Sequence, residues 1–281
     1  MGKDRNSYSK TDLEATFMRM KEDHMLNGQL KPAYNVQIAV ENYFIVHGYV
    51  SNDRTDYNTL IPVLEKHQKA FGSVLEEMTA DSGYCSEKNL LYLKEKGIES
   101  YIKLQDHEKR KTRAYAEDIS KYYNMRVEVF EDEQFYICHD GRELRHIRTE
   151  TKEQNGYTQT FEVYGCADCS GCEHKARCLY KYNAEKDTER NKVMKINEQW
   201  EELREKSHAN IQSERGILKR QTRSIQTEGH FGDIKENENF RRFNYRSADK
   251  VYKEFMLYAI GRNINCLLYT SPSPRDTERS R

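Results

Sequence analysis

Residues 73–86 read SVLEEMTADSGYCS, and this stretch decides the fold. Residues 73–81 are predicted to form a strand, and the strand ends in an Asp-Ser-Gly-Tyr turn that begins at Asp81. Ser86 then offers a cap for a helix that is expected to stop at Gly97. A strand, a turn and a helix in this order are typical of an α/β sheet.

The segments around this stretch extend the same pattern. Residues 33–41 alternate apolar and polar side chains, and residues 43–51 follow after a single asparagine, so a hairpin is predicted. Thr55 or Asp56 can cap a helix with apolar residues at helical spacing. Residues 98–104 are expected to form a further strand.

The pattern changes near residue 105. A charged segment that we expect to be helical comes first, and a hairpin that turns at Asp140 and Gly141 follows. The chain from about 184 to 235 is expected to be mostly helical. A last helix is predicted over residues 247–267.

The composition excludes several classes of protein. The chain has 281 residues, with 46 Lys and Arg against 46 Asp and Glu, so it is no polybasic nucleic-acid binder, although a local basic groove stays open. No apolar stretch reaches the roughly 18 residues of a membrane span, and the start lacks the apolar region of a signal peptide. We therefore expect a cytoplasmic protein with reduced thiols.

Asp81 is the first candidate functional residue. Its carboxylate follows a predicted strand, at the sheet edge where ligands collect in α/β folds. The alternative is a turn-forming or helix-capping aspartate, which is common at such places.

Glu228 is the second candidate, in the sequence TEGHFGDIKENENFRRF. Lys235 lies seven residues later on the same face of an α-helix, and Arg241 and Arg242 follow. Over residues 204–246 there are ten Lys or Arg and six Asp or Glu. A carboxylate on a basic helix suits a divalent cation beside phosphates, whereas the alternative is a solvated charged face.

Taken together, ADSGY after a strand and a later helix with Glu-x6-Lys before a basic stretch resemble the transposases of bacterial insertion sequences. These enzymes belong to the DDE group and have an RNase H-like fold. The resemblance runs from about Asp12 to about Asn265 and includes TDLEATFMRMKEDHMLNGQLKPAYNVQIAVE and the cysteine cluster.

The resemblance assigns roles to individual residues. It makes Asp81 the second carboxylate of the catalytic triad, Glu228 the third, and Lys235 a contact to DNA near the cleaved end. The arginine expected four residues before the glutamate is Ser224 here, and Arg223 is one position away.

The resemblance also implies the chemistry. Two Mg²⁺ or Mn²⁺ ions held by carboxylates cleave DNA strands and transfer them to a target. The partners are double-stranded transposon ends and target DNA, with a homodimer in synapsis, and the location is the bacterial nucleoid.

The first aspartate of the triad is not assigned, because Asp4, Asp12 and Asp23 lack the expected strand context. We therefore expect a fragment that lacks its first core strand and is inactive by itself. The expected parts are an RNase H-like core in 1–104 and 206–268, an inserted β-rich subdomain in 105–205, and a disordered, artefactual tail in 269–281.

Four of the seven cysteines lie in GCADCSGCEHKARC, at the spacing C-x2-C-x2-C-x5-C. This spacing predicts a structural Zn²⁺ site formed by Cys166, Cys169, Cys172 and Cys178. Replacement of one ligand by Cys138 or His174, an iron–sulfur cluster, and a group of reduced thiols remain as alternatives.

Two alternatives to the transposase interpretation remain at this point. The chain could instead be a non-catalytic DNA-binding module containing zinc, or a remnant without present function. The distance between the Asp81 and Glu228 carboxylates in a structure separates the catalytic class from the binding module.

Overall fold

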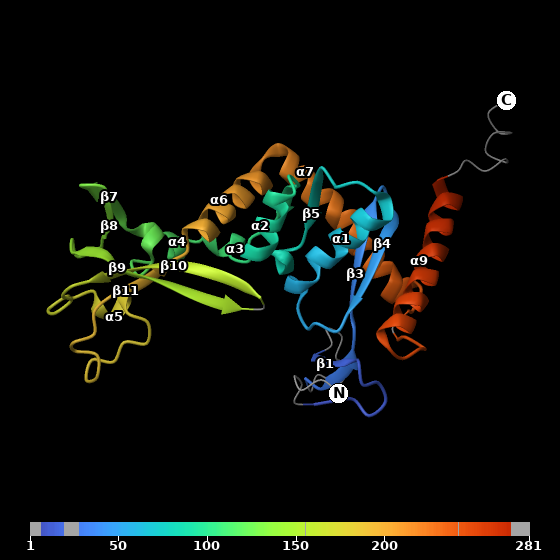
Figure 1. Cartoon of the computed structure of the whole chain (residues 1–281), viewed down its shortest axis with the longest axis horizontal. Coiled ribbons are helices and arrows are strands. Elements are labelled where there is room, and N and C mark those ends of the chain that lie inside the picture. The colour runs from blue at the N-terminus through green and yellow to red at the C-terminus, as the bar shows by residue number, and fades with distance from the viewer. Residues whose placement is uncertain (1–6, 20–27, 155, 241, 271–281) are drawn as a thin grey trace. The chain divides into compact units, whose positions relative to one another are not determined.

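The computed structural model describes residues 7–19, 28–154, 156–240 and 242–270 (Figure 1). The chain forms two compact units: unit 1 comprises Met1–Lys103 and Ala209–Arg281, and unit 2 comprises Leu104–His208. Helices and both parallel and antiparallel strands are present, so the mixed α/β class is confirmed. Asp4, Asp23, Arg241 and most of the tail lie outside the described residues.

The described residues of unit 1 include three pairs of strands. β1 (Thr16–Arg19) pairs with β2 (Leu30–Ala33), and β3 (Asn35–Glu41) pairs with β4 (Phe44–Ser51), both antiparallel, whereas β5 (Glu77–Ala80) and β6 (Glu99–Ile102) are parallel. The predicted hairpin is therefore confirmed. Its turn is formed by Asn42 and Tyr43, which have φ values of 47° and 68°, the left-handed conformation that tight hairpin turns use.

Two α-helices, each preceded by a short 3-10 helix, follow the hairpin strands in unit 1. The short η1 (Asp56–Asn58) precedes α1 (Leu60–Phe71), and η2 (Ser82–Tyr84) precedes α2 (Glu87–Glu95). The Ser86 hydroxyl accepts a hydrogen bond from the Asn89 amide at 3.3 Å, and Gly97 has a φ of 69° after the last turn. Both predicted ends of α2 are therefore confirmed.

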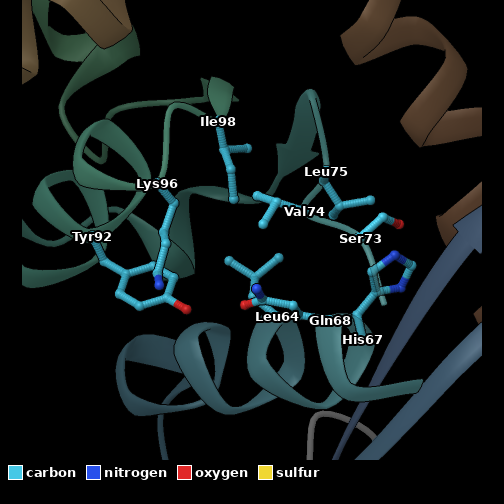
Figure 2. Close-up of a pocket in the computed structure, with 9 residues that line it drawn as sticks. All are labelled: Leu64, His67, Gln68, Ser73, Val74, Leu75, Tyr92, Lys96 and Ile98. Atoms are coloured by element: carbon cyan, nitrogen blue, oxygen red, sulfur yellow. The ribbon is translucent and has the colours of Figure 1, made fainter. Parts of the chain in front are cut away.

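Apolar side chains between α1 and α2 form part of the core of unit 1. Leu64, Leu90, Leu93 and Ile98 are all less than 8% exposed. Figure 2 shows Leu64 pointing toward Val74 and Ile98 across a small hollow. The hollow is about the size that one water molecule needs, so it is a packing defect rather than a ligand site.

Most of the described chain after residue 209 in unit 1 is helical. α7 (Glu214–Arg223) continues into η4 (Ser224–Glu228), α8 (Gly229–Gly232) and η5 (Asp233–Asn237), and α9 (Ala248–Thr270) follows. α9 packs against β4, and Val251, Phe255 and Ala259 on its inner face are at most 2% exposed.

Unit 2 contains a five-stranded antiparallel sheet in the order β11-β10-β9-β8-β7. The strands are β7 (Arg126–Phe130), β8 (Glu133–Ile137), β9 (Glu143–Gln154), β10 (Tyr157–Cys166) and β11 (Val193–Ile196). Four short helices lie along the same part of the chain: α3 (His107–Arg110), α4 (Arg113–Ala116), η3 (Tyr122–Asn124) and α5 (Lys175–Cys178).

The predicted turn at Asp140 and Gly141 is confirmed, since it joins β8 to β9. The prediction that residues 184–235 are mostly helical is wrong in its first part. A strand and irregular chain precede α6 (Glu198–Gln212), within which the boundary between the two units falls. The segment is not helical because Val193–Ile196 pairs with β10 and forms an edge strand of the sheet.

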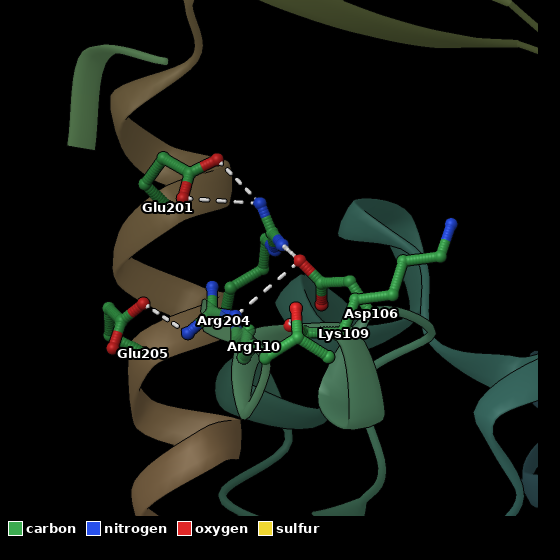
Figure 3. Close-up of polar contacts among 7 residues, drawn as sticks. Asp106, Lys109, Arg110, Glu201, Arg204 and Glu205 are labelled. Atoms are coloured by element: carbon green, nitrogen blue, oxygen red, sulfur yellow. Dashed lines mark hydrogen bonds and ion pairs between the residues drawn. The ribbon is translucent and has the colours of Figure 1, made fainter. Parts of the chain in front are cut away.

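A group of ion pairs fixes α3 to α6 within unit 2 (Figure 3). The Asp106 carboxylate accepts hydrogen bonds from Arg204 and, at 3.4 Å, from Arg110, while Arg204 also donates to Glu201 at 2.9 Å. Burial alone would raise the pKa of Asp106, but the hydrogen bond and charge of Arg204 hold that pKa below its usual range. These contacts join segments that are far apart in the sequence.

Within the described ranges, no helix combines the length and the apolar character needed to span a membrane.

Candidate active site

Asp81 lies immediately after β5, where the sequence predicted it. Its Oδ1 accepts a hydrogen bond of 2.7 Å from the Ser82 amide, so the carboxylate caps η2. The side chain is 59% exposed. Asp81 therefore performs the capping role of the alternative interpretation and still presents a carboxylate to solvent.

Glu228 is the last residue of η4, a helical turn of the π type. Its Oε1 accepts a hydrogen bond of 2.7 Å from Nη2 of Arg223, and its Oε2 accepts one of 3.0 Å from the Ser224 hydroxyl. With a side chain that is 57% exposed, Glu228 is also open to solvent.

The π turn explains why Arg223 is the partner of Glu228. Residues five apart point in different directions on an α-helix of 3.6 residues per turn, whereas the i→i+5 pattern of a π-helix brings them onto one face. The resemblance places an arginine four residues before the glutamate, and Arg223 lies five residues before Glu228. The additional residue of the π turn offsets this difference of one position.

Asp81 and Glu228 converge on the same guanidinium. Nη2 of Arg223 lies 3.9 Å from Oδ1 of Asp81 and 2.7 Å from Oε1 of Glu228. The two oxygens can therefore be no further apart than these two distances together. The structure thus brings two residues far apart in the sequence to one place in unit 1.

The sequence predicted that Glu228 and Lys235 share one face of a regular α-helix, and the helix is not regular here. Both residues lie in π-type turns, η4 and η5, which shift the phase of the helix between them. Lys235 is half-buried, and Arg242 is exposed in the chain after η5. Arg241 lies outside the described residues.

A buried polar contact that the sequence did not reveal holds this helix against α9. His230 is 7% exposed, its Nε2 donates to the Tyr43 carbonyl at 2.9 Å, and its Nδ1 accepts from Nε of Arg262 at 3.1 Å. Arg262 also pairs with Asp233 at 2.9 Å and with Glu238. Arg262 thus links the Glu228 segment to α9.

Burial, together with the nearby charge of Arg262, lowers the pKa of His230, although the hydrogen bond to Tyr43 acts in the opposite direction. The imidazole is therefore neutral at pH 7. His230 supports the Glu228 segment as a structural residue.

Asp12 does not lie with the two carboxylates but serves another purpose. Its Oδ2 accepts hydrogen bonds from the Tyr34 hydroxyl at 2.8 Å and from the Ser247 amide at 3.0 Å, where α9 begins. Glu14 accepts from the Ala248 amide at 2.7 Å. The two carboxylates therefore satisfy the first amides of α9.

Two residues of the cysteine cluster lie in the core of unit 2. Cys166 and Cys169 are 8% and 9% exposed and pack with Tyr136, Leu144 and other apolar residues. Burial, followed by the hydrogen bond with Cys169, raises the pKa of the Cys166 thiol to about 11. Burial also raises the pKa of Cys172 and Cys178.

The structure does not support the zinc site that the spacing predicted. Throughout the ranges that the structure describes, no group of three or more His, Cys, Asp or Glu side chains is placed to hold a metal ion. Cys166 and Cys169 pack as small apolar side chains in the core, whereas Cys172 and Cys178 are only partly buried. Among the residues that the structure describes, no third metal-ligating side chain joins Asp81 and Glu228.

Comparison with known proteins bears on the same residues. The family model described as a transposase DDE domain matches residues 137–268, which supports a DDE transposase. The matched range includes Glu228, Lys235 and the cysteine cluster, whereas Asp81 lies before it. No curated protein and no solved structure matched the chain.

Proposed function

We propose that this chain is part of a DDE transposase of a bacterial insertion sequence, which cleaves DNA strands and transfers them to a target. Asp81 and Glu228 are its second and third catalytic carboxylates. The observation that carries the proposal is the convergence of these two carboxylates on Arg223. A DNA-binding module in which both residues were incidental would give no reason for this convergence.

The donor set fits a hard divalent cation. Two exposed carboxylates already share one positive group, and carboxylate oxygens are the ligands that Mg²⁺ and Mn²⁺ prefer. A bound cation activates the attacking hydroxyl and stabilises the leaving oxygen of the phosphodiester. Asp81 and Glu228 would hold it in the space that the Arg223 guanidinium now shares.

Positively charged side chains have a second role in the proposal. Arg223 lies beside both carboxylates, and Lys235, Arg241 and Arg242 follow Glu228 in the sequence. These four side chains would meet the phosphates of double-stranded DNA. Arg223 takes the role of the arginine four residues before the glutamate, because the π turn offsets its position.

The same proposal includes an RNase H-like core from residues 1–104 and 206–268, with 105–205 as an insertion. Support comes from the grouping of Met1–Lys103 with Ala209–Arg281 in one compact unit. The described residues bring together two carboxylates and no third, and Asp12 is engaged at α9. We therefore propose that the isolated chain lacks a complete two-metal site and does not cleave DNA.

Mn²⁺ binding tests the pair of carboxylates. Asp81→Asn and Glu228→Gln should each weaken Mn²⁺ binding at least about tenfold, as loss of a metal ligand or its support does. Asp249→Asn, which changes an exposed carboxylate of α9, should leave binding unchanged. Equal Mn²⁺ binding by all four proteins would contradict the proposed site.

Incubation with transposon-end DNA and Mg²⁺ or Mn²⁺ tests the proposed inactivity. We expect no cleavage by the isolated chain. Metal-dependent cleavage that is lost in Asp81→Ala would contradict the inactivity while supporting the catalytic role of Asp81.

A further inference from the structure

A continuous polar network lies beside the turn that carries Asp81. Oδ1 of Asp56 accepts hydrogen bonds of 2.8 Å from the side-chain amides of both Asn35 and Gln37. Gln37 also donates to Oδ1 of Asn35 at 2.8 Å and accepts from the Tyr84 hydroxyl. The network thereby joins β3, η1 and η2, which are separate elements of unit 1.

The centre of the network is buried. Gln37 is 7% exposed although its side chain is a polar amide. Burial of such a group is costly unless its hydrogen bonds are satisfied, and here both ends of the amide have partners. Burial, followed by the charges of Asp56 and Asp81, raises the pKa of Tyr84, so its hydroxyl stays protonated and donates.

The network also contacts the backbone of the Ser82–Tyr84 turn directly. A Cβ atom added to Gly83 would lie 2.9 Å from Oδ2 of Asp56, so the Asp56 carboxylate rests directly on the backbone of η2. Asn89, which is 1% exposed, donates to the Tyr84 and Tyr57 carbonyls at 2.9 Å. The backbone immediately after Asp81 is thus held from η1, β3 and α2 at once.

We infer that Asp56 and Tyr84 are positioning residues for Asp81: through Gln37 they fix the Ser82–Tyr84 turn, and the turn fixes the carboxylate that faces Glu228. This inference rests on the proposed function, in which Asp81 holds a metal ion. Neither residue touches the metal or the DNA. Their effect passes through the Ser82 amide, which donates to Asp81 at 2.7 Å.

Two substitutions separate this role from a general loss of folding. Tyr84→Phe removes only the hydroxyl, and Asp56→Ala removes the acceptor of two amides. Tyr43→Phe is the matched control, because it removes a hydroxyl from a side chain that is 49% exposed in the same unit. Circular dichroism of each variant confirms that it is folded.

The first measurement is Mn²⁺ affinity. Tyr84→Phe and Asp56→Ala should each weaken Mn²⁺ binding by about tenfold, since residues that orient metal ligands have effects of this size. The double variant should lose less than the product of the two effects, because both act through one network. Wild-type affinity in Tyr84→Phe, while Asp81→Asn loses binding, would overturn the inference.

The second measurement is amide hydrogen exchange in the turn, which does not depend on metal. Exchange at residues 82–85 should be at least about tenfold faster in Tyr84→Phe than in the wild type or Tyr43→Phe. Unchanged exchange would overturn the inference. If Asp81→Asn leaves Mn²⁺ binding unaltered, the proposed function fails, and the exchange measurement still decides whether the network holds the turn.

Discussion

Gly83 shows how tightly the turn after Asp81 is built. Its φ lies outside the left-handed region, so the glycine is required by space rather than by backbone conformation. A Cβ there would lie 2.9 Å from Oδ2 of Asp56. The carboxylate has little freedom to move away, because Asn35 and Gln37 both bind its other oxygen.

We therefore expect Gly83→Ala to destabilise the protein by about 1–2 kcal/mol, as overpacking of a closed site does. Urea unfolding followed by circular dichroism measures the change. Gly261→Ala is the control, since nothing lies within 4 Å of its added Cβ and it is in α9. That substitution should stabilise the protein by about 0.5–1 kcal/mol, and equal effects at the two sites would contradict the close contact.

At the scale of single elements, α9 depends on carboxylates from the other end of the sequence. Asp12 and Glu14 accept from the amides of Ser247 and Ala248. Burial would raise the pKa of Asp12, but its hydrogen bonds, that from Ser247 first, lower it overall. A lowered carboxyl pKa adds stability above about pH 4, and the contribution is lost as the pH falls through the lower value of the folded protein.

Asp12→Ala should accordingly cost about 1 kcal/mol of unfolding free energy at pH 7, a value that allows for the exposure of the side chain. The difference from the wild type should shrink as the pH falls below about 4. Urea unfolding at several pH values measures it, with Asp12→Asn as a variant that keeps an acceptor. A difference that is independent of pH would contradict the charged hydrogen bonds.

The ion pairs of α6 predict a larger effect in unit 2. The Arg204 side chain is only 16% exposed and joins Asp106 and Glu201. Arg204→Gln removes a positive partner of the partly buried Asp106 carboxylate. The substitution should lower the free energy of unfolding by about 2–3 kcal/mol.

Arg113→Gln provides the matched control for Arg204→Gln, because the Arg113 side chain is 88% exposed and its pair with Glu117 lies at the surface. It should cost less than about 0.5 kcal/mol. Thermal and urea unfolding compare the two variants. Equal stability of both would show that the ion pairs of α3 and α6 do not contribute.

These elements also show what sequence reasoning could and could not predict. The hairpin of β3 and β4 and both ends of α2 follow from local patterns: alternation, a capping serine and a terminal glycine. The π turn at Glu228 could not be predicted, because helical periodicity assumes 3.6 residues per turn. The packing of Cys166 and Cys169 in an apolar cluster could not be predicted either, because the cysteine spacing describes only a loop geometry.

At the scale of the whole molecule, the balance of 46 basic and 46 acidic residues removes any general attraction to DNA. Under the proposed function, binding must come from local positive side chains near Glu228. The logarithm of the DNA-binding constant falls linearly as the logarithm of the salt concentration rises. Each phosphate that a lysine or arginine neutralises makes this slope steeper by about 0.9.

Lys235→Gln and Arg242→Gln should therefore each make that slope less steep by about 0.9. They should also weaken binding to all DNA sequences about equally. Arg113→Gln makes the same change of charge in unit 2 and should leave the slope as it is. Fluorescence anisotropy with a labelled duplex at several salt concentrations measures all three variants. If Arg113→Gln lowered the slope as much as Arg242→Gln, the attraction would depend on total charge, and the residues after Glu228 would have no special role in binding DNA.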